Sequence, residues 1–430
     1  MSMNGSKGLT VIYLTLARIP GERAHSIQIV RTCNALASKG ADVYLISPAR
    51  GAEIEKRGLS QYIAKYYGIK FMRFVLIKMC IPWIVRVLER FKKELWWKML
   101  AISFTIQSMI LAMIIRLSAR LAGGKSIIFL REPLPLIILQ ALKPLHRFKI
   151  VYECHQLPRP SRLFIAALSR CDLIISISNF LKRRLEKIIP RVSLEVCHSA
   201  ADRKIFQEAA DRLELRRELG LPTEMKLISY VGQLSRWKNP EFIVDAFKDL
   251  GMRDVMLIFV GGSREDVMRL RRYCAEKSVD NVLFTGLVEP STSSKYMIAS
   301  DILIHYTPSS GRGLRSYSPL KIIEYMFAAR PIVAPRQPWI EELLEEGVDA
   351  LLFDENSPSD LAEKIRKLLR DEELASRLAL NACRKAEQYT YERRAERILK
   401  AISKILIRSA SNRTHLTGTL DFIGALQQEP

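Results

Sequence analysis

The chain has 430 residues, 48% hydrophobic and 26% charged, an ordinary composition that supplies the cores of two globular domains. Seven dispersed cysteines without a Cys-x-x-Cys pair exclude a disulfide framework and give no zinc motif. Of the net charge of +22, residues 1–200 carry +21, from 32 Lys and Arg against 11 Asp and Glu, so an anionic partner is expected there: a polyanion, a membrane surface or an acceptor molecule.

Apolar strand-like segments alternate with amphipathic helical segments along the chain. In the first half the expected strands are 9–15, 42–47, 126–130, 149–153, 173–176 and 193–197. The expected helices there are 26–39, 83–120, 134–142 and 179–189. In the second half the expected strands are 226–231, 255–260, 282–285, 302–305, 331–334 and 350–353. The expected helices there are 239–249, 264–277, 294–299, 318–329, 339–346 and 359–368.

Two such series predict an α/β protein of two doubly wound, Rossmann-like domains that face each other across a cleft. The predicted domains are residues 1–200 and 201–390. A helix over about 370–407 is expected to cross back onto the first domain, so that 391–430 hold its end and a loose tail. Ligands of doubly wound sheets bind beyond the carboxyl ends of the strands, which predicts a site in the cleft.

No secretory signal is expected, because the polar N-terminus leads directly into the first strand. With reduced thiols, this predicts a cytoplasmic protein, and peripheral contact with the inner face of the cell membrane stays open. The longest apolar stretch, 99–115, carries four polar residues and is shorter than the roughly 20 residues that span a bilayer. We expect it to be a buried or interfacial helix.

Residues 65–98 hold nine basic and two acidic residues interleaved with aromatic ones. This pattern suits a membrane interface, and the alternatives are a nucleic-acid surface or an ordinary amphipathic face. We favour a membrane interface for residues 65–98 and expect the protein to bind no nucleic acid.

The most informative motif surrounds Glu324. Ser318 and Pro319 form a turn that opens a helix at Leu320, and the free N–H groups and dipole of a helix N-terminus suit phosphate. Lys321 adds a positive charge in the first turn, and Glu324 lies on roughly the same face, where it can accept hydrogen bonds from sugar hydroxyls. Diphosphate plus ribose is the chemistry of a nucleotide-sugar. The simpler alternative is that Glu324 only compensates the helix dipole.

Three further turns follow expected strands of the second half. In the first, Gly232 lets the backbone approach a ligand, Lys238 can reach a phosphate and Arg236 lies nearby. The other two hold Gly262 and the pair Leu287–Val288. Each of the three also fits an ordinary strand–helix connection.

Two segments of the first half follow strands in the same way. Gly21 permits an unusual turn, and the N–H groups before Ser26 can face a diphosphate or an acceptor; His25 lies beside them. His155 follows the strand at 149–153, although a lone histidine is more often structural.

These segments together resemble the retaining GT-B glycosyltransferases of family 4 over roughly residues 9–400. The resemblance rests on Ser-Pro-Leu-Lys at 318–321, on Glu324 as the second glutamate of Glu-x7-Glu, and on Lys238 of a Gly-Arg-Leu-x-x-x-Lys-Gly motif. The sequence departs from the family pattern at Ser316, which replaces the first glutamate, and at Gln233, which replaces the arginine.

The resemblance implies a metal-independent hexosyltransferase that needs no bound cofactor. It would move a sugar from a nucleotide-sugar, bound by the second domain, to a hydroxyl of a glycan, lipid-linked or other anionic acceptor, bound by the first. Such reactions build cell-envelope polysaccharides. Two alternatives stay open: a catalytically degraded membrane- or nucleic-acid-binding protein, and an inverting transferase or epimerase of the same architecture.

The same resemblance assigns roles to individual residues. Catalytic roles are expected for His155, Lys238 and Glu324. Donor binding is expected for Gly21, Gly232, Arg236, Lys238, Gly262, Leu287, Val288, Ser318, Pro319, Leu320, Lys321 and Glu324. Acceptor binding is expected for His25 and Ser26, and no residue is assigned to a metal.

Overall fold

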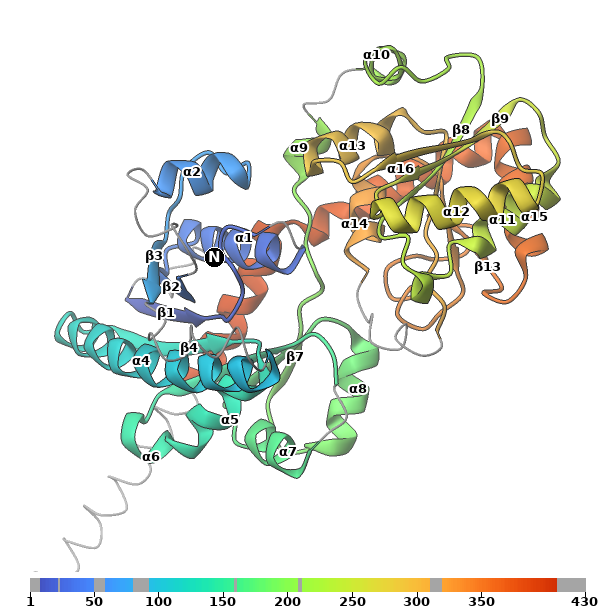
Figure 1. Ribbon diagram of the computed structural model, residues 1–430. Helices are drawn as coiled ribbons and strands as arrows, with labels where there is room; N and C mark the ends of the chain where they lie inside the picture. The colour runs from blue at the N-terminus through green and yellow to red at the C-terminus, as the bar shows by residue number, and fades with distance from the viewer. Residues whose placement is uncertain are drawn as a thin grey trace, which may run out of the picture. The chain divides into compact units, whose positions relative to one another are not determined.

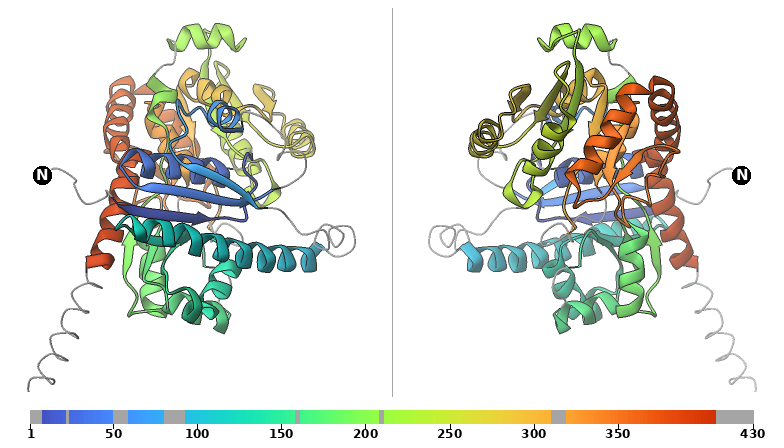
Figure 2. Two further views of the ribbon diagram at one scale, coloured as in Figure 1. Left: turned by 90° about the vertical axis from the view of Figure 1, so that its left-hand side faces the viewer. Right: turned by 90° about the vertical axis from the view of Figure 1, so that its right-hand side faces the viewer.

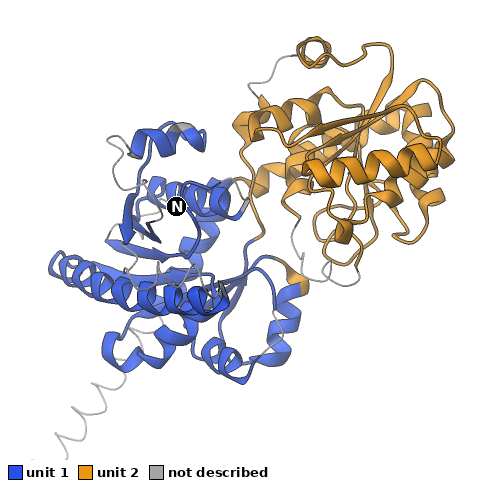
Figure 3. Cartoon of the chain, viewed as in Figure 1, with its two compact units in different colours: residues 1–177, 181–197, 391–430 blue, residues 178–180, 198–390 orange. Residues whose placement is uncertain are grey.

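The computed structural model describes residues 8–21, 24–49, 59–79, 93–157, 161–207, 211–309 and 319–407. The chain divides into two compact units (Figure 3). Unit 1 consists of residues 1–177, 181–197 and 391–430, and unit 2 of residues 178–180 and 198–390. Each unit contains its own parallel sheet, so the predicted pair of doubly wound domains is confirmed at the level of fold.

Unit 1 is built on a seven-stranded sheet in the order β3-β2-β1-β4-β5-β6-β7. Figure 1 labels β1 to β4 and β7 of this sheet. Its strands are β1 (Leu9–Leu14), β2 (Asp42–Pro48), β3 (Val75–Met79), β4 (Lys125–Leu130), β5 (Lys149–Cys154), β6 (Leu173–Ser176) and β7 (Leu194–Val196). Its helices are α1 (Ala24–Ser38), α2 (Leu59–Tyr66), α4 (Lys93–Leu121), α5 (Pro133–Ala141), α6 (Lys143–His146), α7 (Arg162–Ser169) and most of α8 (Asn179–Ile188). All six residues of β1 are buried, as expected for a central strand of a parallel sheet.

Unit 2 has a six-stranded parallel sheet in the order β10-β9-β8-β11-β12-β13. Its strands are β8 (Lys226–Val231), β9 (Val255–Val260), β10 (Val282–Gly286), β11 (Ile302–Ile304), β12 (Ile332–Pro335) and β13 (Leu351–Phe353). Its helices are α9 (Arg203–Gln207), α10 (Arg212–Glu218), α11 (Glu241–Leu250), α12 (Arg264–Glu276), α13 (Pro290–Ala299), α14 (Leu320–Phe327), α15 (Pro358–Arg370) and α16 (Glu372–Ala386), with short 3₁₀ turns η2 (Arg236–Lys238) and η4 (Glu387–Tyr389).

The strand order of each sheet fixes where a ligand can bind. In unit 1 the order reverses between β1 and β4, and in unit 2 it reverses between β8 and β11. The loops that leave two such neighbouring strands run to opposite faces of the sheet and open a crevice beyond the carboxyl ends. The residues that follow β1, β4, β8 and β11 are therefore the ones to examine for a site.

The predicted helix at 339–346 is wrong, because this segment forms turns. Ile340 and Glu341 donate to the carbonyl of Gln337, which makes one helical turn. The helical series of backbone hydrogen bonds ends at Glu345, whose backbone N–H donates to the side chain of Asp349 at 2.6 Å. Helical spacing of the apolar side chains does not reveal such a competing side-chain acceptor.

The single helix expected over 370–407 is also wrong, because it is broken twice. Asp371 accepts a hydrogen bond from the N–H of Leu374 and so begins α16 anew. A 3₁₀ turn then precedes Thr390, which pairs with Ala201 through the backbone, and residues 391–407 form a separate helix that belongs to unit 1. Strand β3 was not predicted, because its alternating pattern is weak. Residues 83–92 of the predicted helix 83–120 lie outside the described residues.

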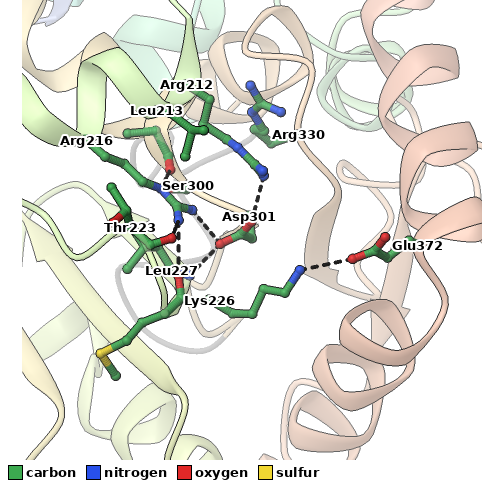
Figure 4. Close-up of polar contacts among 12 residues, drawn as sticks. Arg212, Leu213, Arg216, Thr223, Lys226, Leu227, Ser300, Asp301, Arg330 and Glu372 are labelled. Carbon is green, nitrogen blue, oxygen red and sulfur yellow. Dashed lines mark hydrogen bonds and ion pairs between the residues drawn. The ribbon is translucent and has the colours of Figure 1, made fainter.

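A buried ion pair fastens α10 to the sheet of unit 2 (Figure 4). The carboxylate of Asp301, at the start of β11, lies 2.6 Å from the guanidinium of Arg216 and 2.7 Å from that of Arg212. The same carboxylate accepts from the N–H of Leu227 at 2.6 Å, and Arg216 is only 2% exposed. Asp301 therefore joins α10, β8 and β11.

We expect Asp301→Asn to lower the free energy of unfolding by roughly 3–5 kcal/mol, since it leaves the Arg216 charge buried without its partner. The control is Glu372→Gln, which removes the surface pair of Lys226 with a carboxylate that is 81% exposed and should cost less than about 1 kcal/mol. Urea unfolding measures both values. Equal effects of the two variants would contradict this account.

Candidate functional site

Lys238 joins the two loops that leave the reversal point of the unit 2 sheet. It ends the 3₁₀ turn after β8, and its Nζ donates to Oγ1 of Thr307, which follows β11, at 2.8 Å. The loops after β8 and β11 are the pair that borders the crevice of a doubly wound sheet. The predicted site residue Lys238 is thus at the place where this fold binds ligands.

The surroundings of Lys238 favour an anion. Burial lowers the pKa of its ammonium group to about 8, and Nζ lies 4.4 Å from the centre of the Trp237 ring. Burial, with a smaller contribution from the Lys238 charge, lowers the pKa of neighbouring His305 to about 3, so that imidazole is neutral at pH 7. A partly dehydrated ammonium group next to a neutral imidazole is stabilised when a negative charge binds.

Two arginines lie near the same loop. Arg236 is exposed on the 3₁₀ turn, and Arg269 of α12 donates to the carbonyl of Leu234 at 2.6 Å and pairs with Glu241. Burial and the charge of Arg236 lower the pKa of Arg269. The sequence analysis missed Arg269, because nothing in its local pattern shows that α12 returns to the loop after β8.

Glycines let the loops after β8 and β9 lie against each other. A Cβ atom on Gly262, which has φ +89°, would lie 2.7 Å from Cδ1 of Leu234. A Cβ atom on Gly261, which has φ +113°, would lie 2.4 Å from the carbonyl oxygen of Gly232. The backbone of Gly232 is in turn held by its N–H, which donates to Val260 at 2.9 Å. The predicted residues Gly232 and Gly262 are therefore brought together.

The end of β10 adds an apolar surface. The N–H of Gly261 donates to Oγ1 of Thr285 at 3.3 Å, which connects the loop after β9 to the end of β10. Leu287 follows and is 80% exposed, while Val288 is half-buried. An exposed leucine at a strand end gives a flat ligand ring an apolar contact.

The first turn of α14 carries the remaining predicted residues of unit 2. Lys321 Nζ and Glu324 Oε2 lie 2.6 Å apart, so the two charges pair with each other. Pro319 occupies the N-cap position without a capping side chain, and Leu320 is half-buried. Ser318 and Ser316 lie outside the described residues.

Tyr325 holds α14 at the carboxyl ends of the central strands. Its hydroxyl accepts from the N–H of Val231, the last residue of β8, at 2.9 Å, and donates to the carbonyl of Ile304, the last residue of β11, at 3.2 Å. Tyr325 is fully buried. The helix that carries Lys321 and Glu324 is therefore fixed to the same two strands as Lys238.

Glu355 and Gln337 hold the loop after β11, and the sequence analysis missed both. Glu355 accepts hydrogen bonds from the N–H and hydroxyl of Ser309 and from the amide of Gln337. Gln337 also donates to the carbonyl of Thr307 at 2.8 Å. These two side chains support Thr307, the partner of Lys238.

In unit 1, the loop after β1 closes on itself through two of the predicted residues. A Cβ atom on Gly21 would lie 2.5 Å from the carbonyl oxygen of Arg18, and its N–H donates to the hydroxyl of Tyr67 at 2.7 Å. The buried hydroxyl of Ser26 donates to the same Arg18 carbonyl at 3.0 Å. His25 is half-buried beside it on α1. Ser26 thus has a structural partner, and its contact with an acceptor stays a prediction.

His155 belongs to a buried charged group at the end of β5. Its Nε2 lies 2.9 Å from Glu153 Oε1, which also bonds to Arg394, while Tyr13 donates to the other oxygen at 3.2 Å. Burial alone would raise the pKa of Glu153, but Arg394 and His155 hold this pKa well below its usual value. Burial and the charge of Arg131 lower the pKa of His155. With its pKa lowered, the His155 imidazole is neutral at pH 7 and lies next to the Glu153 carboxylate.

Glu132 is a second buried carboxyl group, at the reversal point of the unit 1 sheet. It follows β4 and accepts from the Thr15 hydroxyl at 2.6 Å and from the N–H of Leu16 at 3.1 Å, both after β1. Burial raises its pKa. The sequence analysis missed Glu132 because a lone glutamate after a strand carries no motif. Within the described ranges, no group of three or more His, Cys, Asp or Glu side chains is arranged to hold a metal ion.

Comparison with known proteins shows which families and structures the chain resembles. Residues 211–385 match the family model of the glycosyl transferases group 1. The chain is 26% identical over 251 residues to spore coat protein SA of Bacillus subtilis, a match that covers 54% of this chain and 64% of that protein. It is 26% identical over 226 residues to the D-inositol 3-phosphate glycosyltransferase of Corynebacterium jeikeium, covering 50% and 52%. The chain thus aligns with between half and two thirds of the length of these relatives.

Solved structures resemble the chain over nearly its whole length. Anabaena HepE in complex with UDP gives a TM-score of 0.67 at 18% identity, covering 92% of this chain and 99% of that one. Sucrose-phosphate synthase from Thermosynechococcus elongatus gives 0.67 at 17% identity, covering 93% and 100%. At this identity the likeness shows the fold, and the fold is GT-B.

We expect Gly262→Ala to lower the free energy of unfolding by roughly 2–4 kcal/mol, because the new Cβ meets Leu234 and the backbone is left-handed. The control is Gly251→Ala, where φ is +64° and no atom lies within 4 Å of the new Cβ. It should cost only about 1 kcal/mol. Urea unfolding compares the two, and an equal loss would show that the close loop approach is unimportant.

Proposed function

Because residues 211–385 match the family model of the glycosyl transferases group 1 and the chain has the GT-B fold, we propose that the protein is a retaining hexosyltransferase that uses a nucleotide-sugar donor. The observation that carries the proposal is the partly dehydrated Lys238 ammonium at the reversal point of the unit 2 sheet. Family 4 is the proposed subfamily, and UDP is the proposed nucleotide because the similar HepE was solved with UDP.

The donor diphosphate binds at Lys238 and Arg236, with the N-terminus of α14 and Lys321 as a further cationic end. Here the charge that the ligand brings stabilises an ammonium group that burial has made easier to deprotonate. The exposed Leu287 lies against the base, and Glu324 accepts hydrogen bonds from the ribose. Binding therefore replaces the Lys321–Glu324 pair by two contacts with the donor.

Catalysis depends mainly on the charge that develops as the glycosidic bond to the diphosphate breaks. Lys238, Arg236 and Lys321 stabilise this charge, and such preorganised groups are the largest contribution in many transferases. They take the place of a divalent cation, so the reaction is metal-independent and needs no cofactor. In unit 1, the half-buried imidazole of His155, next to Glu153, hydrogen-bonds to a sugar hydroxyl.

The acceptor is a hydroxyl of a glycan or lipid-linked molecule in cell-envelope polysaccharide synthesis, bound by the basic unit 1 near His25 and Ser26. The enzyme acts in the cytoplasm. The second candidate is a binding protein whose transferase site has degraded. The substitution of Gln233 for the usual arginine favours it, while Lys238, Lys321 and Glu324 favour activity.

Isothermal titration with UDP, GDP and ADP tests the proposal. We expect UDP to bind most tightly and Lys238→Met to weaken it roughly 10- to 100-fold, the value of one charge-assisted hydrogen bond. Above pH about 8 the wild-type Kd should rise by up to tenfold per pH unit, since Lys238 loses its proton there while the diphosphate, with a second pKa of about 6, stays ionised.

The Lys238→Met variant should lack this alkaline dependence. The control is Lys226→Met, which removes a lysine at the opposite end of β8 and should leave affinity and pH dependence unchanged. A folded protein that binds none of the three nucleotides would favour the binding-protein alternative.

Glu324→Gln separates ribose binding from phosphate binding. We expect UDP affinity to fall about tenfold, because a charged acceptor for the ribose is lost. Affinity for pyrophosphate should stay or rise, because Lys321 is released from its pair at 2.6 Å. Lys321→Met should weaken both ligands. Equal weakening of UDP and pyrophosphate by Glu324→Gln would show that Glu324 acts only through the helix.

A further inference from the structure

Helix α4 packs against unit 1 with one face and leaves its opposite face exposed. It has 29 residues and runs along the sheet (Figure 2), where it contacts β1, β3, β4 and α5. The residues on its inner face are each no more than 3% exposed: Leu100, Ala101, Phe104, Thr105, Ser108 and Ala112. This side of the helix is part of the core.

The outer face of α4 is apolar and open. It carries large apolar side chains at spacings of three or four residues, with exposed fractions from 36% to 83%: Ile102, Ile106, Ile110, Met113, Ile114, Leu117 and Leu121. No charged residue occurs between Lys98 and Arg116. At about 1.5 Å per residue this apolar stripe is nearly 30 Å long. It is therefore a continuous apolar patch and not a set of isolated surface leucines.

Basic residues border the stripe. At about 100° per residue, Arg120 projects along the same edge of the helix as Ile102, and Lys98 lies about 40° beyond that edge. Lys98 and Arg120 thus lie near the two ends of one margin. The unit they belong to carries the excess positive charge, +21 over residues 1–200. An apolar stripe with a basic margin is the pattern of a helix that lies in a membrane interface.

We propose that the outer face of α4 inserts into the interfacial region of a leaflet that contains anionic phospholipids. Residues Glu94–Leu121 are long and apolar enough to cross a bilayer, longer than the sequence segment 99–115 indicated, and 39% of the apolar window is buried. The helix lies in the plane of the leaflet, because spanning would detach its inner face, including Thr105 and Ser108, from the sheet.

A second copy of the chain is the competing occupant of this face. Two copies that meet through α4 would bring two strongly basic units together, which charge repulsion opposes. An anionic leaflet instead complements both the stripe and its margin. The predicted membrane contact of residues 65–98 falls partly on 80–92, which lie outside the described residues. The proposed contact is therefore assigned to α4 alone.

The test is co-sedimentation of the full chain with vesicles of phosphatidylcholine, with and without about 30 mol% phosphatidylglycerol. We expect binding to the anionic vesicles, at least tenfold weaker for the double variant Ile106→Gln/Ile110→Gln. The control, Leu380→Gln, changes an apolar side chain that is 54% exposed on α16 and should bind like the wild type. The double variant Lys98→Glu/Arg120→Glu should lose the preference for anionic vesicles.

Circular dichroism and sedimentation velocity on the same samples complete the test. All variants should keep the wild-type spectrum, since every changed side chain is on the surface. The proposal is overturned if the wild type binds neither type of vesicle, or if the wild type and Ile106→Gln/Ile110→Gln bind anionic vesicles equally well. A wild-type dimer that this variant dissociates, without vesicle binding, would assign the face to a second copy.

Discussion

The contact between the Lys238 ammonium and the Thr307 hydroxyl is the interaction on which the site of unit 2 depends. It places a cation, whose pKa burial lowers to about 8, between the loops that leave β8 and β11. The structure around it serves this placement. Gly262 lets the neighbouring loop approach, Tyr325 fixes α14 to the same two strands, and Glu355 holds the chain that carries Thr307.

Unit 1 uses the same fold differently. At its reversal point the carboxyl group of Glu132 bridges the chain after β1 and β4, and at the end of the next strand, β5, Glu153 lies between His155 and Arg394. Because Arg394 lies beyond the last residue of unit 2, the charged group at β5 forms only once the chain has returned to unit 1. The cation of unit 2 and the carboxylates of unit 1 both lie at the carboxyl ends of parallel strands, where doubly wound sheets bind their ligands.

Local sequence patterns predicted the parts of this arrangement that are themselves local. The alternation of strand-like and helical segments predicted both parallel sheets. Lys238 and Glu324 were predicted because each lies in a short motif beside a strand end or a helix start. Arg269 and Glu355 were missed because they reach the site through tertiary contacts with no local signal. The helix expected at 339–346 failed for a similar reason, since the side chain of Asp349 takes the N–H that would have continued it.

In the proposed function, Lys238 is a partly dehydrated cation that binds the donor diphosphate. Carbon-13 NMR of reductively methylated lysines, with the Lys238 signal assigned by its loss in Lys238→Arg, measures this pKa directly. We expect a pKa near 8 in the free protein and a rise when UDP binds, because the bound anion stabilises the protonated form. A pKa close to 10.4, the ordinary value for lysine, that UDP leaves unchanged would contradict it.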